Sequence, residues 1–488
     1  MLLSLCVAPV AAAQSVSDLW RQNCLMCHGA RGQGGGAGTR SMLTEEMRAL
    51  ENDRVFFEAI KNGLPDKGMV AFGRTLSDEQ VWGLVVHIRE LQAAEFRKKN
   101  PDVTPEDGVY RAKDHAFKLE TVVPGGVDVP WSVDFLPGGV DGKGGGDEKG
   151  GAGGMMLVTG RSGDLRVHST GRAGGKLSEP VKGTPKVRNR GQGGLMDVAV
   201  HPEYATNGWV YLSYSEEILD GKRSTGMTTI VRGKLKKDGD GWSWTDQETL
   251  FRAKPEHFLP TDLHFGCRIV FTEKQADGRR LMFFPIGERG RMEMAQDLKR
   301  PNGKVHRLWD DGEAPKDNPF VGQEGAYPSI WSYGHRNPQG LAFDLQGRLW
   351  DTEHGPRGGD EVNLVEKGKN YGWPIVSFGI NYSGEPFRTP WGESAIAMPA
   401  FHWTPSIGAC GLDVARGPAF AKWKGDLLAG GLSGTNVDRL RVKEDGSVER
   451  EELLHGIGRV RDVVCGPDGS VYVVLNDPDS VVRMVEVE

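Results

Sequence analysis

The residues whose types and spacing best suit chemistry stand near the start of the chain, where residues 24–28 read Cys-Leu-Met-Cys-His. This spacing attaches a haem covalently, because Cys24 and Cys27 lie one helical turn apart and His28 can reach the iron. A structural zinc site would need a second cysteine pair, but the other cysteines stand alone. A redox dithiol would need a strand-helix-strand context, whereas residues 29–38 form a glycine-rich run. The motif therefore predicts haem c and a redox protein.

A haem of this kind needs a second axial ligand further along the chain. Met69, in the segment Gly68–Phe72, supplies a thioether, and such a ligand raises the haem potential as an electron acceptor requires. The competing methionines lie too close to the attachment site or on an early helical stretch, and are interpreted as core or surface residues: Met26, Met42 and Met47.

A helix is predicted directly after this methionine. Ser77 and Gln80 form a capping box. Apolar residues then recur at helical spacing, at Val81, Leu84, Val85, Ile88 and Leu91. Residues 16–97 therefore resemble a small class I cytochrome c domain, in which the two cysteines of the motif would be the attachment points and His28 and Met69 the axial ligands.

Length, charge and the first residues limit the possible classes of protein. A chain of 488 residues exceeds what one hydrophobic core usually serves, so at least two domains are expected. The formal net charge of -6, with interspersed signs, disfavours a nucleic-acid partner. Residues 1–13 read as a signal peptide, although no Lys or Arg precedes their apolar run. Export to the periplasm or secretion is expected, with no membrane span elsewhere.

The rest of the chain shows a repeated β pattern. Residues 98–117, polar and proline-containing, are predicted to be a linker, and 118–488 to be the second domain. Short apolar strands recur six times, at 154–158, 208–212, 280–284, 347–350, 425–429 and 469–473. A six-bladed β-propeller fits this repeat, whereas β-sandwiches would need two or three copies with linkers that are not visible. The predicted fold is thus multidomain: a small all-α cytochrome c domain followed by an all-β six-bladed β-propeller. The glycine-rich stretch 138–154 is expected to be a disordered surface loop.

Two polar stretches of the predicted propeller carry groups that folding does not require. Gln192 stands among glycines, where the backbone can approach a flat ligand while the amide bonds to it; a plain turn explains this stretch equally well. His264, with Glu288 further along, is the pair that a general base requires, because a carboxylate fixes the tautomer and stabilises the imidazolium. A histidine alone is more often structural.

Two further stretches suit an anionic ligand and a cation. Arg336 and Asn337 bring planar donors together, and these fit an anionic or quinonoid ligand. In residues 353–363, followed by 370–374, turns expose backbone carbonyls beside carboxylates, which is how calcium is bound. An acidic surface turn is the alternative interpretation of that stretch.

Three segments together resemble those of a known family. They are Gly-His-Arg-Asn-Pro-Gln-Gly-Leu-Ala-Phe at 334–343, Glu-His-Gly-Pro-Arg-Gly-Gly-Asp-Glu at 353–361 and Asn-Tyr-Gly-Trp-Pro at 370–374. From about residue 118 to the C-terminus, the chain is similar to the soluble pyrroloquinoline-quinone (PQQ)-dependent aldose and glucose dehydrogenases, the glucose/sorbosone dehydrogenase family. The resemblance implies a six-bladed propeller, in agreement with the repeat.

The resemblance also implies roles for individual residues. His264 would be the catalytic base that removes the hydroxyl proton at the anomeric carbon of a sugar, and Glu288 would orient it. The quinone and its carboxylates would be held by Gln192, Arg336, Asn337, Arg459 and Arg461, and covered by Trp403. The backbone carbonyls of Gly355 and Pro356 would bind the calcium that polarises PQQ. Glu361 with Tyr371 would form a second, structural calcium site.

Several positions depart from the family pattern. Ser433 stands where glucose-oxidising members place a Lys near the cofactor, which puts cofactor affinity in question. Glu288 replaces the shorter Asp of some members, and Cys267 stands where many have Gly, so the sugar remains open. Cys267 is also one of three cysteines left after haem attachment and removal of the predicted leader with Cys6; the others are Cys410 and Cys465, and buried free thiols are expected.

The leading hypothesis joins the two halves. An exported quinohaemoprotein would oxidise an aldose to its lactone at PQQ, with the fused haem c taking electrons one at a time and passing them to a downstream cytochrome or oxidase. Fusion would replace diffusion with a high effective concentration. The alternative is a haem-bearing propeller that binds carbohydrate or protein and only relays electrons. A third possibility is the same machinery acting on a different alcohol.

Overall fold

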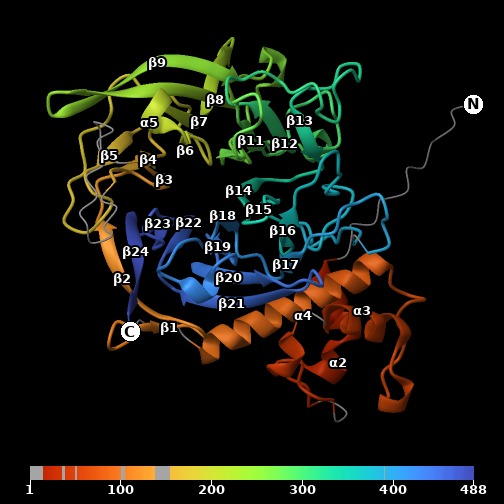
Figure 1. Cartoon of the computed structure of the whole chain (residues 1–488). Helices are drawn as coiled ribbons and strands as arrows, with labels where there is room; N and C mark the ends of the chain where they lie inside the picture. Colours follow the sequence, from red (N-terminus) through yellow and green to blue (C-terminus); the bar gives the residue numbers. More distant parts are fainter. Residues whose placement is uncertain are drawn as a thin grey trace, which may run out of the picture.

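The computed structural model describes residues 15–35, 39–49, 52–100, 105–137, 154–389 and 391–487. It contains a small helical domain followed by a ring of six β-sheets, which confirms the predicted fold class (Figure 1). The predicted leader, residues 1–13, and the glycine-rich residues 138–153 lie outside the described residues. Within the described residues, no helix is both long enough and apolar enough to cross a membrane.

The helical domain is built around its last and longest helix. Its elements are α1 (Val16–Asn23), α2 (Leu25–His28), η2 (Glu46–Arg48), α3 (Asn52–Asn62), η3 (Pro65–Lys67) and α4 (Asp78–Lys99). The capping box is confirmed, because the Ser77 hydroxyl accepts from the Gln80 amide at 3.3 Å and the Gln80 side chain bonds back to the Ser77 amide. α4 continues two residues into the predicted linker, since 98 and 99 are helical.

The helices enclose one apolar cluster. It includes Trp20 of α1, Phe57 of α3 and Leu84 of α4, all buried. The predicted helical spacing of α4 is borne out, because four of its five predicted apolar positions are buried and the fifth, Leu91, packs against the same cluster. Burial of these side chains holds short helices that would not form alone.

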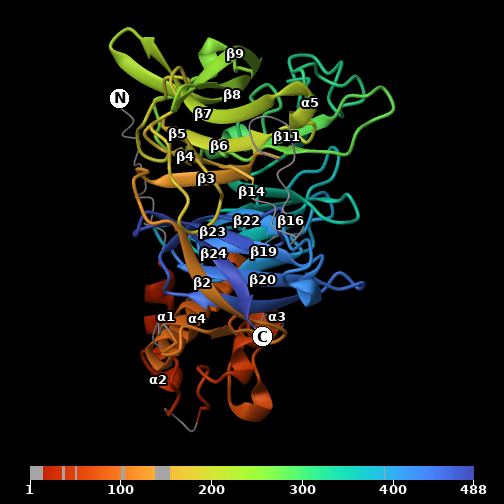
Figure 2. The same cartoon turned by 60° about the vertical axis from the view of Figure 1, so that its left-hand side comes forward.

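The ring consists of six antiparallel sheets, and chain order follows the ring (Figures 1 and 2). Three of them are β3 (Pro130–Phe135), β4 (Met156–Gly160) and β5 (Leu165–His168); β6 (Leu195–Val200), β7 (Trp209–Asp220), β8 (Arg223–Asp238) and β9 (Gly241–Phe251); and β10 (Val270–Phe271), β11 (Leu281–Ile286), β12 (Lys304–Trp309) and β13 (Ile330–Tyr333). The next two are β14 (Pro338–Phe343), β15 (Leu349–Glu353), β16 (Asp360–Leu364) and β17 (Phe401–Trp403); and β18 (Ala409–Val414), β19 (Leu427–Gly431), β20 (Asn436–Val442) and β21 (Val448–His455). Short helical turns between strands are α5 (Tyr204–Asn207), η4 (Pro255–His257), η5 (Met292–Ala295) and η6 (Ala421–Trp423).

The sixth sheet closes the ring. It joins β22 (Arg459–Cys465), β23 (Val471–Asn476) and β24 (Ser480–Val487) to β2 (Ala116–Val123) and β1 (Tyr110–Arg111) from the start of the domain. β2 pairs antiparallel with β24, with Leu119 opposite Met484. The first and last strands of the propeller therefore lie in one sheet, which ties the ends of the ring together.

The six recurring segments of the sequence correspond to the second strand of each sheet: β4, β7, β11, β15, β19 and β23. These strands are mostly buried on both faces; every residue of β4, β15, β19 and β23 is buried. A strand that packs against neighbouring blades on both faces loses its polar alternation and reads as a continuous apolar run. The repeat was visible in the sequence for this reason.

Aspartate carboxylates link three pairs of neighbouring blades; Asp197 is buried, and Asp134 and Asp413 are half-buried. Asp134 of β3 accepts a hydrogen bond from the Val200 amide at 2.6 Å, and Asp413 of β18 accepts one from the Cys465 amide at 2.8 Å. Asp197 of β6 does the same for the Ile269 amide at 2.7 Å. Each carboxylate satisfies a backbone donor that would otherwise be buried without a partner.

The helical domain packs against the outer side of the propeller, and α4 forms most of the contact (Figures 1 and 2). The Trp82 indole donates to the Phe378 carbonyl at 3.2 Å, and its ring lies 4.9 Å from that of Trp391. Phe378 and Ile380 of the propeller belong to the same apolar cluster as the core of the helical domain. The two domains thus share one continuous core at this junction.

Candidate functional site

The haem-attachment segment lies where α1 gives way to α2. Cys24 is buried in the apolar cluster, while Cys27 is exposed, and both are free thiols. The His28 Nδ1 atom is buried with no partner among the described residues. These three side chains lie on one helical turn, which fits the thioether and axial-ligand roles.

Three methionines border the same cluster: Met42, Met47 and Met69. Met26, by contrast, is 91% exposed and points away from the core, as the sequence suggested. Met69 is held by a short backbone bridge, in which its amide bonds to the Leu64 carbonyl at 3.1 Å and its carbonyl accepts from the Leu64 amide at 2.9 Å. Its role as the second axial ligand stays a prediction, now placed beside the cluster that must enclose the haem.

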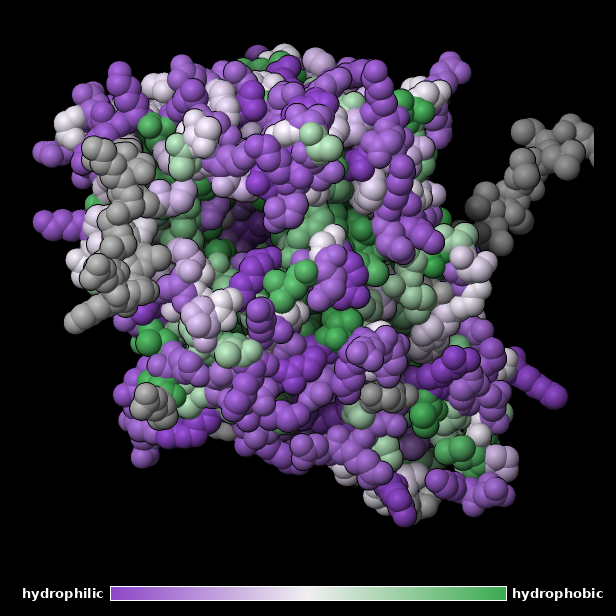
Figure 3. All heavy atoms as spheres, in the orientation of Figure 1, coloured by the Kyte–Doolittle hydropathy of each residue, from purple (hydrophilic) through white to green (hydrophobic). Residues whose placement is uncertain are grey.

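The second site is a cavity of about 230 Å³ in the propeller, called the axial cavity below. Six of the predicted residues line it: Gln192, Asn337, Gly355, Ser433, Arg459 and Arg461. They come from different blades, and Figure 3 shows the face of the ring seen in Figure 1, hollowed near its centre. Residues separated by more than half of the propeller sequence therefore meet at one place.

His264 and Glu288 form the expected pair beside this cavity. The imidazole Nδ1 atom is hydrogen-bonded to the Glu288 carboxylate, and both side chains are buried. Burial lowers the pKa of His264, and the nearby Arg336 lowers it further, while Glu288 acts in the opposite direction. The imidazole is thus neutral at neutral pH with a carboxylate behind it, which is the form that accepts a proton.

The backbone around His264 is held in an unusual conformation. His264 has a φ of +53°, a left-handed region that costs a residue with a Cβ about 1–3 kcal/mol. The Gln192 side-chain oxygen accepts from the His264 amide at 2.7 Å. Arg289 donates to the Leu263 carbonyl and, at 2.7 Å, to the Thr261 carbonyl. Gln192 thus holds the His264 backbone as well as lining the cavity, a role that the sequence did not indicate.

Asn337 and Arg336 lie on the other side of His264. The Asn337 Oδ1 atom accepts from the Gly266 amide at 3.1 Å, whereas its Nδ2 donor is buried with no partner among the described residues. Arg336 donates to the His354 carbonyl at 3.1 Å and lines a smaller cavity next to the first one. An unpartnered buried amide at a cavity wall fits a polar ligand, because such a donor is costly to leave unpaired.

Arg459 and Arg461 supply positive charge to the cavity wall. The Arg461 Nε atom donates to the Asn476 side chain at 3.1 Å, and the guanidinium lies 4.1 Å from the centre of the Trp131 ring. Arg459 is exposed beside it. Two adjacent guanidinium groups without a carboxylate partner among the described residues suit a ligand with carboxylates.

Trp403 is not among the residues that line this cavity, and its role as a cover of the cofactor stays a prediction. Its indole donates to Asp438 at 2.7 Å, and its ring borders a different cavity, between the two domains. Trp131, which is buried, and Tyr382, which is 71% exposed, are the Trp and Tyr residues that line the cavity.

The predicted structural calcium site falls in a buried acidic region. Glu361 and Tyr371 both line the smaller cavity. The Tyr371 hydroxyl, however, donates to the Leu364 carbonyl and accepts from the Glu366 amide, so only the backbone carbonyl of Tyr371 is left as an oxygen ligand. Pro356 lines neither cavity, while Gly355 lines both.

His354 lies within the segment 353–361, and its type and spacing alone indicated no role for it. It lines both cavities, and its Nε2 atom is buried with no partner among the described residues. Burial and the surrounding arginines hold its pKa well below the ordinary value, so the ring stays neutral. A neutral imidazole between two cavities suits a hydrogen bond to a polar ligand.

The residues that depart from the family pattern lie at or near the cavity. Ser433, at the position where the family resemblance implies a Lys, lines the cavity. Cys267 and Cys410 lie below it and approach the backbone and side-chain oxygens of Gln339, each at 3.7 Å. Cys267, Cys410 and Cys465 are free, as expected.

A covalent haem motif on a helical domain, joined to a propeller whose cavity combines a His-Glu pair with guanidinium groups, defines a two-domain redox protein. Comparisons with known proteins sharpen this class. The glucose/sorbosone dehydrogenase model matches residues 127–483, and the model for subunit III of cbb3-type cytochrome c oxidase matches residues 11–88. The chain therefore belongs to the glucose/sorbosone dehydrogenase family and carries a fused cytochrome c domain.

Individual relatives agree with this assignment. The aldose sugar dehydrogenase YliI of Escherichia coli is 41% identical over 357 residues, which are 72% of this chain and 88% of the relative. The crystal structure of the soluble aldose sugar dehydrogenase of Escherichia coli, in its apo form, has a TM-score of 0.64 at 37% identity and covers 76% of this chain and all of its own. The PQQ-bound aldose sugar dehydrogenase of Streptomyces coelicolor has a TM-score of 0.57 at 26% identity and covers 78% of this chain and all of its own.

Proposed function

We propose that this protein oxidises an aldose to its lactone with PQQ held in the axial cavity, and that the electrons pass to haem c in the fused domain. The observation that carries the proposal is the buried His264-Glu288 pair beside a cavity lined by two guanidinium groups, in a chain that also has a haem-attachment motif. A binding scaffold needs neither a base nor this charge arrangement. A PQQ-bound relative supports the choice of cofactor.

The residues of the chain have separable roles in this reaction. His264 accepts the proton of the anomeric hydroxyl, and Glu288 fixes its tautomer and stabilises the imidazolium that forms. Arg459 and Arg461 bind the carboxylates of the cofactor, and the unpaired Asn337 amide donates to it. Bound PQQ would supply the hydride acceptor. The cavity wall excludes water around the base, which strengthens these charge interactions.

Calcium fits two places near this cavity. The Gly355 carbonyl, beside the cavity, offers one hard oxygen ligand. Asp351, Glu353 and His335 bring their ligand atoms within 4.8 Å of one another, and Glu361 lies next to them through Asn363. Both Asp351 oxygens are buried with no hydrogen-bond partner among the described residues. A divalent cation would compensate these carboxylates and fix the loop that carries Gly355.

Contacts across the domain junction support transfer of electrons to the haem. Arg357, one residue after Pro356, forms a two-point ion pair with Glu90 of α4, at 2.6 and 2.7 Å. Glu90 lies 3.7 Å from His87, whose ring is 5.3 Å from that of Trp20. The Trp20 ring in turn is 6.3 Å from that of His28. A continuous set of contacts therefore joins the loop that carries Gly355 and Arg357, called the cofactor loop below, to the predicted haem ligand. Close contact of this kind favours electron transfer, because tunnelling rates fall steeply with distance.

The place of action is part of the same proposal. Residues 1–13 have the composition of a leader, and thioether attachment of haem fits an exported protein. The electrons would leave the haem domain to a downstream cytochrome or oxidase. Ser433 in the cavity predicts weaker cofactor binding than in members with a Lys there.

A stopped-flow experiment on haem-loaded protein tests the proposal. The haem absorbance band is recorded after protein reconstituted with PQQ and calcium is mixed with each of a panel of aldoses. We expect sugar-dependent haem reduction that requires PQQ and is lost in His264→Asn. His115→Asn is the matched control, because His115 is also paired with a carboxylate, Glu486, but on the outer side of the propeller.

The other outcomes discriminate between the hypotheses. An artificial acceptor that is reduced while the haem stays oxidised would retain the dehydrogenase and reject the relay. If neither is reduced with any sugar, the binding-scaffold hypothesis or a different alcohol replaces aldose oxidation.

A further inference from the structure

One hairpin of the propeller joins the wall of the axial cavity to the core of the haem domain. It spans residues 380–386, in the long connection between β16 and β17, which lies beside the start of α4 (Figure 1). Its ends form an antiparallel bridge between Ile380 and Pro386, and inside the bridge the Asn381 amide donates to the Glu385 carbonyl at 2.7 Å. We call this segment the junction hairpin.

The base of the junction hairpin is held from both domains. Ile380 and the preceding Phe378 are buried in the apolar cluster of the haem domain. The Trp82 indole of α4 donates to the Phe378 carbonyl at 3.2 Å. On the propeller side, Ile380 exchanges two backbone hydrogen bonds with Arg357 of the cofactor loop, both at 3.0 Å. The base is therefore fixed between α4 and the loop that borders the axial cavity.

The turn of the junction hairpin also passes close to the haem domain. Gly384 closes this turn with a φ of +88°, in the left-handed region, and its amide donates to the Asn381 carbonyl at 2.8 Å. A Cβ atom on Gly384 would lie 3.1 Å from the Cβ atom of Ser15, which caps α1. The position thus requires glycine both for its backbone conformation and for the close approach of α1.

Tyr382, at the tip of the junction hairpin, lines the axial cavity. Its side chain is largely exposed and makes no hydrogen bond or ring contact among the described residues. Much of the remaining wall is polar, and includes Gln192, His354 and Arg459. A sugar carries hydroxyl groups around its rim and C–H groups on its ring faces, so it fits a polar cavity with one free aromatic wall.

We propose that the Tyr382 ring binds the C–H face of the sugar and that the haem domain positions it, so that the fused domain forms part of the substrate site. This inference rests on the proposed function, because the sugar must enter the axial cavity. Contacts with the haem domain order the hairpin before the sugar arrives, which lowers the entropy cost of binding. Tyr382 touches no reacting group, so its contact should lower KM and leave kcat unchanged.

Steady-state kinetics with an artificial acceptor test the role of Tyr382 in the haem-loaded full chain reconstituted with PQQ and calcium. D-glucose and D-xylose are the probes. Tyr382→Ala should raise KM about three- to tenfold at constant kcat, which is the range that one aromatic contact supports. Tyr382→Phe, which keeps the ring, should retain the wild-type KM. Leu219→Ala is the control, because Leu219 is also exposed near a hairpin tip, that of β7 and β8, but is not among the residues that line the axial cavity.

A second variant tests the role of the haem domain. Trp82→Phe removes the donor to the Phe378 carbonyl and keeps an aromatic ring at the junction, so KM should rise about threefold while kcat and the haem spectrum stay at the wild-type level. Trp423→Phe is the matched control, since Trp423 is also fully buried but its indole nitrogen has no partner among the described residues. A raised KM in Tyr382→Ala with an unchanged KM in Trp82→Phe overturns the positioning by the haem domain.

Calorimetry separates this proposal from the proposed oxidation. The Kd of each sugar is measured on PQQ-loaded His264→Asn protein, which should not turn over, with and without Tyr382→Ala. A Kd that rises with Tyr382→Ala, in a protein whose wild type oxidises neither sugar, supports the sugar contact and rejects the oxidation. Oxidation by wild type with KM and Kd unchanged in Tyr382→Ala overturns the contact alone. Binding of neither sugar, or a raised Kd for PQQ with an unchanged Kd for sugar, also overturns it, since in the second case the ring covers the cofactor.

Discussion

The haem-attachment segment and the axial cavity place their functional groups in opposite ways. In the first, Cys24, Cys27 and His28 lie on one helical turn, so local geometry alone brings them together. In the second, Gln192, His264 and the residues near 337 and 461 come from different blades and meet only after the ring closes. A local motif can be recognised from the sequence alone, whereas a dispersed site forms only when the fold brings its residues together. Substitutions in the propeller cavity should therefore leave the haem site intact, and substitutions in the haem-attachment segment should leave the cavity intact.

The largest expected effect is that of replacing His264, which should abolish the chemistry of the cavity and leave the haem site intact. Replacing His264 with Ala removes the proton acceptor, which typically contributes about 10²–10⁴-fold to a rate. Sugar-dependent reduction of both the haem and an artificial acceptor should fall by this factor in stopped-flow traces. Reduction of the haem by dithionite should keep its wild-type spectrum and extent. An equal loss of dithionite-reducible haem would contradict the independence of the two sites.

The second effect concerns Glu288, the carboxylate bonded to His264, and is measured in the pH profile of kcat/KM. Because burial lowers the pKa of His264, its neutral form persists below the ordinary value of about 6.5. The acid limb of log kcat/KM, which reports the base of the free enzyme, should thus lie below that value. Glu288 raises this pKa, so Glu288→Gln should move the limb to still lower pH.

The same variant should also lower the pH-independent rate by about tenfold or more, since the imidazolium that forms is no longer stabilised. The measurement is a pH profile of kcat/KM with an artificial acceptor, for wild type and Glu288→Gln. A limb that moves to higher pH would show that Glu288 does not act on His264. Asp262→Asn, close in sequence but paired with Arg188, is the control.

The contrast between local and dispersed groups also explains what the sequence could predict. The six second strands were visible because burial on both faces makes them continuous apolar runs. The roles of Gln192 and Arg289 in holding the His264 backbone were not, because these hydrogen bonds join loops far apart in sequence. The hydrogen bond of Trp403 to Asp438 was not predicted for the same reason. Asp438 lies on the next blade, and no spacing rule indicates which way the indole points.

The contacts across the domain junction could not be predicted from motifs that belong to one domain only. Trp82 sits in a helix whose apolar spacing suggested only a haem-facing side, yet it packs against Phe378 and Trp391 of the propeller. Arg357 lies inside a family motif, yet its partner Glu90 belongs to the fused domain. Residues that contact the other domain can be recognised only when the relative position of the two domains is known.

The smallest expected effect tests whether this junction connects the two regions. Glu90→Gln removes one charge of the Glu90–Arg357 pair, whose Arg357 side chain is 36% exposed and so screened by solvent. Such a pair contributes about 1 kcal/mol or less, which corresponds to a change of at most about fivefold in the population of the docked domains. Haem reduction by sugar should slow by up to this factor, while reduction of an artificial acceptor stays unchanged.

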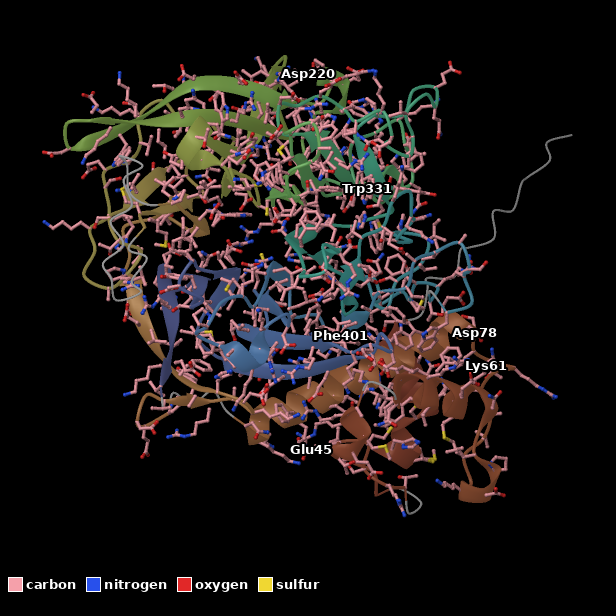
Figure 4. All side chains as sticks on the ribbon, viewed as in Figure 1. Glu45, Lys61, Asp78, Asp220, Trp331 and Phe401 are labelled. Atoms are coloured by element: carbon pink, nitrogen blue, oxygen red, sulfur yellow. The ribbon has the colours of Figure 1, made fainter. Side chains whose placement is uncertain are left out.

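Asp78→Asn is the matched control, since Asp78 forms an exposed ion pair with Lys61 within the haem domain (Figure 4). It should leave both rates at the wild-type level. If Glu90→Gln slows the artificial acceptor as much as the haem, the pair acts on the cofactor loop that follows His354 rather than on electron transfer. If it slows neither, the aromatic contact of Trp82 with Phe378 is sufficient to hold the domains, and the coupling between the local and the dispersed site runs through apolar packing.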